Sequence, residues 1–109
     1  MTFEQYQKEA TKMAVYPDIG NNFIYPVLGL SGESGEVAER IKIVLRNKGG
    51  KMNQEDIDGL KGDLGDVLWY LSQLAQELGL NFEEVAQYNL KKLKSRQSCG
   101  VIKTEGIKS

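Results

Sequence analysis

Between residues 54 and 78 an apolar residue returns every three or four positions, which is the period of one face of an α-helix. The apolar stripe is wide and consists of Ile57, Leu60, Leu64, Val67, Leu68, Leu71, Leu74, Ala75 and Leu78. A different face carries the polar side chains of Asp63, Asp66, Tyr70, Gln73 and Glu77. A helix with two such faces needs neighbours that cover its apolar side, so this segment predicts a helical fold in which the stripe is buried.

Local signals predict two helices before this segment. Thr2 and Gln5 have the spacing of a capping box, which predicts a helix that ends before the breaker-rich loop at residues 16–22. Pro26 is suited to an early position of a second, long helix that runs to about Asn47. The chain has only two prolines in total, so few positions interrupt a helical pattern.

Similar signals define the third and fourth helices. Asn53 can cap the third helix, and Gly79 can end it in the left-handed conformation. Asn81 and Glu84 resemble another capping box, at the start of a fourth helix that ends near Arg96. The predicted fold class is therefore all-α, an antiparallel helical bundle of about four helices with short connections.

Length and charge limit the protein's organisation and its partners. A chain of 109 residues allows one domain, predicted at residues 1–97, followed by a polar tail at residues 98–109. Four helices of this size leave a thin core, so we expect self-association to complete the bundle. The net charge of −1 argues against nucleic-acid binding. Because residues 1–12 are polar and no apolar run approaches ~20 residues, we expect no signal peptide, no membrane partner and a cytoplasmic location.

Two scarce residue types exclude several kinds of catalytic site. The chain has no histidine, which excludes His-dependent triads, zinc–histidine catalysis and the Glu-x-x-His ligands of di-iron bundles. Its one cysteine, Cys99, allows neither an internal disulfide nor a cysteine-based zinc site. If the protein is an enzyme, its acid–base and metal chemistry must depend on carboxylates.

An internal repeat places carboxylates and glycines in register. Residues 29–37 read Gly-Leu-Ser-Gly-Glu-Ser-Gly-Glu-Val, and residues 59–67 read Gly-Leu-Lys-Gly-Asp-Leu-Gly-Asp-Val. The repeat puts six glycines inside predicted helices, namely Gly29, Gly32, Gly35, Gly59, Gly62 and Gly65. Each costs ~1 kcal/mol relative to alanine, so we expect a backbone, a ligand or a neighbouring helix to approach closely there.

The repeat also brings four acidic residues together if the second and third helices form a hairpin. A turn at Gly49-Gly50 makes facing residue numbers sum to roughly 99. Glu33 then faces Asp66, and Glu36 faces Asp63, with no arginine expected between them. Four carboxylates at close range repel one another unless a cation lies among them, and oxygen ligands select Mg²⁺ or Mn²⁺. The pattern predicts a divalent metal site.

The motif blocks at residues 28–37, 64–70 and 89–93 resemble those of the MazG-like nucleotide pyrophosphohydrolases, over roughly residues 5 to 100. This resemblance implies an all-α, Mg²⁺-using enzyme that hydrolyses nucleoside triphosphates to the monophosphate and pyrophosphate. It implies homodimers or homotetramers, and a role in nucleotide house-cleaning or pool control. Mn²⁺ is a possible substitute for Mg²⁺.

The family pattern is a Glu-Glu-x-x-Glu block followed by a Glu-x-x-Asp block. Glu33 and Glu36 match the last two acids of the first block, and Asp66 matches the Asp of the second. Gly32 stands where the leading Glu often is, and Asp63 replaces a Glu, which shortens its reach. The resemblance implies metal binding by all four acids, with Glu33 or Glu36 accepting the proton of the attacking water.

The fourth helix offers positive charge for the phosphates. Asn89, Lys92 and Arg96 share one helical face, and the family's Asn-x-x-Lys spacing matches the first two. The same cations could instead only complement the dipole at the helix C-terminus. Candidates for contact with the base are aromatic, namely Phe23, Tyr25, Trp69 and Tyr70.

Other functions stay open on the sequence alone. Within the same class, the preference could be like that of a dUTPase or dCTPase, or of a phosphoribosyl-ATP pyrophosphohydrolase. From a different class, the chain could be a non-catalytic helical interaction module whose glycines allow tight dimer packing. Release of pyrophosphate from a nucleotide in Mg²⁺ separates the two classes.

Overall fold

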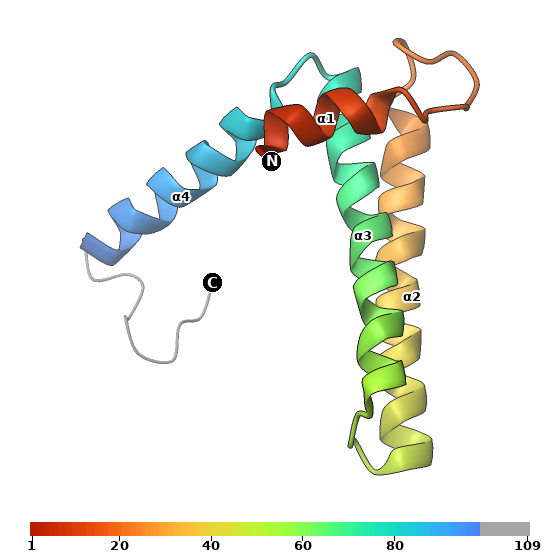
Figure 1. The fold of residues 1–109 in the computed structure, drawn as a ribbon. Coiled ribbons are helices and arrows are strands. Elements are labelled where there is room, and N and C mark those ends of the chain that lie inside the picture. The colour runs from red at the N-terminus through yellow and green to blue at the C-terminus, as the bar shows by residue number, and fades with distance from the viewer. Residues whose placement is uncertain (99–109) are drawn as a thin grey trace.

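The computed structural model describes residues 1–98, and its regular elements are four helices (Figure 1). They are α1 (Phe3–Thr11), α2 (Ile24–Lys48), α3 (Gln54–Glu77) and α4 (Phe82–Ser98). Within residues 1–98 the structure has no strand, so the predicted all-α fold class is confirmed. Cys99 and the remainder of the predicted tail lie outside the described residues.

The helices α2 and α3 form a long antiparallel hairpin, side by side along their whole length (Figure 1). The turn between them is possible because Gly49 and Gly50 adopt φ angles of +61° and +83°, which only glycine accepts readily. Asn53 then caps α3, accepting a hydrogen bond of 2.8 Å from the backbone N–H of Asp56. Lys48 closes the turn through an ion pair of 2.8 Å with Asp56. The predicted turn and cap are confirmed.

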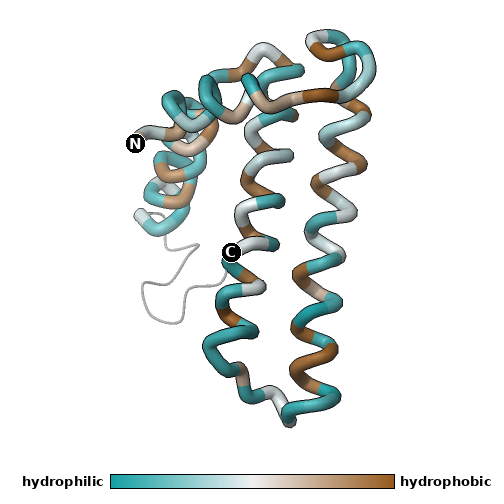
Figure 2. Tube along the Cα trace, turned by 45° about the vertical axis from the view of Figure 1, so that its right-hand side comes forward, coloured by the Kyte–Doolittle hydropathy of each residue, from teal (hydrophilic) through white to brown (hydrophobic). Residues whose placement is uncertain are grey.

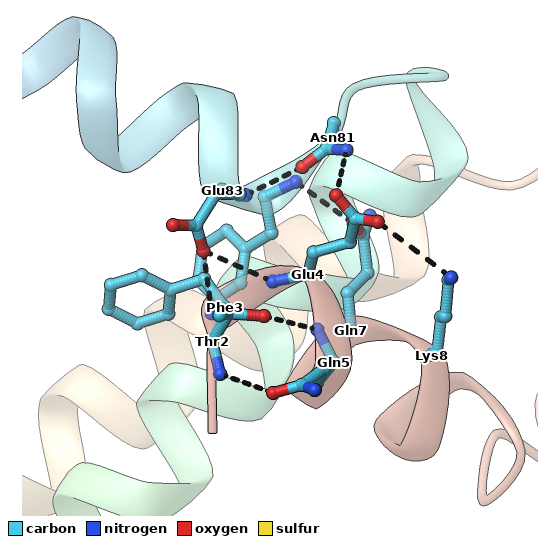
Figure 3. A network of polar contacts seen from close by, with 9 residues as sticks. Thr2, Phe3, Glu4, Gln5, Gln7, Lys8, Asn81 and Glu83 are labelled. Carbon is cyan, nitrogen blue, oxygen red and sulfur yellow. Dashed lines mark hydrogen bonds and ion pairs between the residues drawn. The ribbon is translucent and has the colours of Figure 1, made fainter.

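The short helix α1 lies across the open end of the hairpin, and α4 extends from there away from α2 and α3 (Figure 1). Hydrogen bonds join the N-termini of α1 and α4 (Figure 3). The backbone N–H groups of Phe3 and Glu4 donate to the Glu83 carboxylate at 2.7 and 3.3 Å. The Gln7 amide donates to the carbonyl oxygen of Leu80 at 2.9 Å. A carboxylate at the positive end of α1 is electrostatically favourable, so these contacts fix where α4 begins.

The predicted helix caps are correct in position but not always in partner. The capping box of Thr2 and Gln5 is present, with hydrogen bonds of 3.1 and 2.7 Å. The predicted box of Asn81 with Glu84 is wrong, because the Asn81 side chain accepts instead from the N–H of Glu83 at 2.8 Å. The Asn81 amide donates to the Glu4 carboxylate, so the contact with α1 determines its orientation (Figure 3).

The buried core of residues 1–98 is small and lies mostly where α1 meets the hairpin and α4, with Val44 buried apart from it near the turn of the hairpin. Its buried hydrophobic residues are Ala10, Tyr16, Val44, Ala75 and Phe82. The Phe82 ring packs against Phe3, with ring centroids 5.1 Å apart. Apolar and polar residues alternate along both helices of the hairpin (Figure 2), but few of the apolar ones are covered.

The predicted burial of the apolar stripe on α3 is wrong for the residues at its outer edge. Ile57, Leu64, Leu71 and Leu78 are all exposed, Leu64 by 58%. The reason is that α2 packs against the face of α3 that carries Gly59, Asp63 and Tyr70, while α4 extends away from the hairpin (Figure 1). One side of the hairpin therefore presents an uncovered row of large apolar side chains.

Candidate functional site

Two contacts between the long helices confirm the register that the sequence predicts. The Tyr70 ring of α3 lies where a side chain on Gly29 of α2 would be, and the Arg40 guanidinium lies over Gly59. Both pairs of residue numbers sum to 99, as the hairpin geometry requires. The same register places Glu33 opposite Asp66 and Glu36 opposite Asp63. We call these four residues the acidic cluster.

The members of the acidic cluster lie close enough to one another to affect the ionisation of Glu33. Partial burial raises the pKa of Glu33 above its usual value, and the charges of Asp66, Glu36 and Asp63 raise it further. Glu36 lies on α2 with Glu33, whereas Asp63 and Asp66 lie on α3, so charges from both helices act on Glu33. Such mutual repulsion favours a bound cation or a proton at Glu33.

One cation already lies at the edge of the acidic cluster, which the sequence does not predict. The Nε of Arg40 donates to Oδ2 of Asp63 at 2.7 Å. Arg40 is one helical turn beyond Glu36 on α2, and it crosses to α3 over the bare backbone of Gly59. The prediction that no arginine lies between the acids is therefore wrong at Asp63, although Glu33, Glu36 and Asp66 form no ion pair in residues 1–98.

The acidic cluster fits a divalent ion by its chemistry, but its side chains do not converge on one point. In the described part of the chain, no three side chains of Asp, Glu or Cys lie close enough to hold one metal ion. Asp63 is turned toward Arg40, and the other carboxylates repel one another. The donors are all hard oxygen ligands, as Mg²⁺ and Mn²⁺ prefer. Binding of one ion would require these side chains to turn toward it.

The glycines of the repeat fall into two groups. Gly29 and Gly59 each face a large side chain of the opposite helix, which confirms the expected close approach at these two positions. Within residues 1–98 the chain itself makes no such approach at the other four, because no atom lies within 4 Å of the place of a side chain at Gly32, Gly35, Gly62 or Gly65. At these positions the approach of a ligand or of a second copy stays a prediction. These four positions leave open space beside the acidic cluster.

Of the aromatic candidates, Tyr70 is the one that the charges of the acidic cluster affect, and Tyr25 lies next to it. Partial burial is the main cause that raises the pKa of Tyr70, and interactions with Tyr25, Glu33 and Asp66 raise it further. The rings of Tyr25 and Tyr70 have centroids 6.4 Å apart. Trp69 instead donates its indole N–H to the carbonyl oxygen of Ala10 at 3.2 Å, which ties it to α1. Phe23 is exposed just before α2.

Glu77 at the end of α3 holds the loop before α2, a role that the sequence does not predict. Its carboxylate accepts hydrogen bonds from the Tyr16 hydroxyl and from the N–H groups of Gly20 and Asn22, the latter two at 2.9 Å. Partial burial by itself raises the pKa of Glu77, but these hydrogen bonds together outweigh it and lower the pKa below its usual value. Because Tyr16 stacks on Tyr25 at 4.7 Å, Glu77 also positions the aromatic residues. The hairpin register could have found it, since 22 and 77 sum to 99.

The predicted phosphate-binding residues lie on exposed positions of α4. Asn89, Lys92 and Arg96 are all exposed, and the Lys92 Nζ lies 6.0 Å from the centroid of the Tyr88 ring. In the described chain, α4 contacts α1 and α3 but not α2. The structure therefore places the four acidic residues on facing positions of α2 and α3, but it does not bring the cations of α4 to the acidic cluster of the same chain (Figure 1).

Comparisons with known proteins match the chain to one family and to one phage protein. The family model for the MazG nucleotide pyrophosphohydrolase domain matches residues 26–100, which include most of α2 and all of α3 and α4. A protein of Mycobacterium phage L5, described as Gene 37 protein, is 42% identical over 111 residues, covering 97% of each chain. No solved structure matches significantly. None of the helices described in residues 1–98 is long and apolar enough to cross a membrane.

Proposed function

The chain belongs to the MazG nucleotide pyrophosphohydrolase family, and we propose that it hydrolyses nucleoside triphosphates to the monophosphate and pyrophosphate with Mg²⁺ or Mn²⁺. The observation that carries this proposal is the register of the hairpin, which places Glu33 opposite Asp66 and Glu36 opposite Asp63. A cluster of carboxylates that repel one another is suited to bind a divalent ion, and a triphosphate brings such ions with it.

In this proposal all four acids bind the metal, and one of the two glutamates has a second role. Glu33, Glu36, Asp63 and Asp66 hold the metal. When bound, a divalent ion supplies charge neutralisation for the phosphates and a lower pKa for the attacking water. Glu33 or Glu36 accepts the proton of that water as general base. Tyr25 and Tyr70 beside the acidic cluster offer flat surfaces for the base of the nucleotide.

The phosphates need further positive charge, which we assign to Lys92 and Arg96, and a hydrogen-bond donor, which we assign to Asn89. Because α4 does not contact α2 of its own chain, we propose that these residues serve the acidic cluster of a second copy. A lysine ammonium acts as a point charge toward phosphate, and an asparagine amide donates a hydrogen bond beside it. The active site would then be complete only in an oligomer.

Self-association is supported by the uncovered side of the hairpin. Ile57, Leu64, Leu71 and Leu78 are exposed at intervals of seven residues along α3. This spacing is typical of a seam between two packed helices, where each apolar side chain fits between those of the partner. We propose that a second copy covers this row, in a homodimer or a homotetramer.

The experiment that tests the function is a panel of ribo- and deoxyribonucleoside triphosphates, with phosphoribosyl-ATP included, in the presence of Mg²⁺. The proposal predicts that at least one nucleotide yields equal amounts of monophosphate and pyrophosphate. The nucleotide that is cleaved fastest separates a dUTPase- or dCTPase-like preference from that of a phosphoribosyl-ATP pyrophosphohydrolase. If the protein releases pyrophosphate from none of the nucleotides, a non-catalytic role as a helical interaction module is favoured instead.

A further inference from the structure

Arg40 makes the one ion pair of the acidic cluster in residues 1–98. Its Nε lies 2.7 Å from Oδ2 of Asp63, a distance typical of a strong, charge-assisted hydrogen bond. The Asp63 side chain is only 15% exposed and that of Arg40 39%, so the pair is partly shielded from water. It differs in this from the pair of Lys42 with Glu39, in which both side chains are more than half exposed.

The backbone of α3 is shaped to admit the guanidinium. A Cβ built at Gly59 would overlap the Arg40 guanidinium, whereas one built at Gly62, a turn further along the same helix, would meet nothing within 4 Å. A glycine inside a helix costs ~1 kcal/mol relative to alanine. At residue 59 the missing side chain provides the path by which Arg40 reaches Asp63.

We propose that Arg40 is a built-in counter-cation of the acidic cluster, which competes with the divalent metal ion for Asp63. This inference rests on the proposed function, because it takes Asp63 as a metal ligand. A carboxylate oxygen that accepts a short hydrogen bond from a guanidinium binds a metal less well, and two cations on one carboxylate repel each other. Arg40 is thus a positioning residue that neutralises Asp63 in the metal-free protein and raises the metal concentration needed for binding.

Two variants remove Arg40 from Asp63 by different routes. Arg40→Ala removes the guanidinium. Gly59→Ala keeps the charge but fills the path, and the long arginine side chain can move away without disturbing the helices. Each has a matched control. Lys42→Ala removes one positive charge from the same helix, and Gly62→Ala adds the same methyl group to the same helix in open space.

The measurement is titration of the nucleotide-free protein and the four variants with Mn²⁺, with free ion detected by electron paramagnetic resonance at 0.15 M salt. Arg40→Ala should tighten Mn²⁺ binding by about two- to tenfold, and Gly59→Ala should change it in the same direction by less. The two controls should stay within about twofold of the parent.

Three results would overturn the inference. Weaker binding by Arg40→Ala would mean that Arg40 orients Asp63 toward the metal instead of competing for it. Equal binding by Arg40→Ala and Lys42→Ala would mean that only the net charge matters. In both of these cases the proposed function still stands, provided that the parent releases pyrophosphate and binds Mn²⁺. The third result is that no protein in the series binds Mn²⁺, and then the metal assignment of the proposed function fails as well.

Discussion

Asp66 is the acid whose charge reaches the most elements of the molecule. Partial burial is the main cause of the raised pKa values of Tyr6 on α1, Glu33 on α2 and Tyr70 on α3. The charge of Asp66 raises all three further. Asp63, by contrast, is half-buried and paired with Arg40. The two acids of α3 are therefore not equivalent, and we regard Asp66 as the acid most readily available to an incoming cation.

Lys92 and Lys91 provide a direct test of the phosphate face of α4, since both are exposed and they project about 100° apart around the helix. Lys92→Ala should raise KM for the nucleotide by about five- to hundredfold with little change in kcat, as expected for a contact made equally in the ground and transition states. Lys91→Ala is the control in the same steady-state assay. Small and equal effects would show that the basic residues only form a solvated helix end, and a larger effect at Lys91 would identify the other face.

At the scale of residues, the sequence predicts the positions of the acidic cluster but not its partners. The repeat places Glu33 opposite Asp66, because this register depends only on the position of the turn at Gly49-Gly50 and on the regular rise of the two helices. The sequence does not predict the pair of Arg40 with Asp63, because a long side chain can reach several residues of the opposite helix. For Glu77 the hairpin register indicates only that it lies opposite residue 22. Its bonds to the loop are harder to predict, because two of its three partners are backbone N–H groups, which carry no residue-type signal.

The glycines of α2 and α3 determine how closely side chains of one helix approach the other. Gly29→Ala should lower the free energy of unfolding by about 1 kcal/mol or more, because its Cβ would overlap the Tyr70 ring and the ring must move. Gly32→Ala should raise it by up to ~1 kcal/mol, because the methyl group meets no atom and the helix propensity improves. Chemical denaturation of the metal-free variants checks both, and equal effects would contradict the role given to Gly29.

Glu77 connects the end of α3 to the loop before α2, so its ionisation should affect stability. Its pKa is lower in the folded protein than in the unfolded chain, where it is near the ordinary value of 4.5. The carboxylate thus stabilises the fold above that value, and this contribution is lost as the pH falls through the folded pKa. Glu77→Gln should cost about 1–3 kcal/mol at pH 7 and progressively less below pH ~4.5.

Thermal unfolding from pH 7 to pH 3 measures this difference, with Glu39→Gln as the control for an exposed carboxylate paired with Lys42. A difference between Glu77→Gln and the parent that stays constant over this range would show that the hydrogen bonds to the loop do not depend on the charge of Glu77.

At the scale of elements, the capping residues predict the helix boundaries well, since Thr2 and Asn53 act locally. The direction of α4 could not be predicted in this way. It depends on contacts of Glu83 and Gln7 across the N-terminus of α1, which join residues far apart in the chain. The amphipathic pattern of α3 predicts two faces, but not which one meets α2.

At the scale of the whole molecule, residues 1–98 bury few large apolar side chains and expose many, so assembly is the property to measure. We expect the parent to be at least a dimer by light scattering coupled to size exclusion. Leu64→Glu should shift it toward the monomer, because the charge would lie in the row that we assign to the interface. Val15→Glu is the control, since Val15 is 90% exposed and lies in the loop before α2. A monomeric parent would contradict the proposed interface.

The central claim is that the acidic cluster carries out metal-dependent pyrophosphate release, and product analysis of the parent beside Glu36→Gln and Asp66→Asn tests it most directly. With saturating Mg²⁺ and the preferred nucleotide, the parent should form pyrophosphate and monophosphate in equal amounts. Each variant should be slower by more than ~10²-fold while remaining folded, because each loses a charged ligand for a hard ion. Turnover near that of the parent in either variant, or release of orthophosphate by the parent, would contradict this claim.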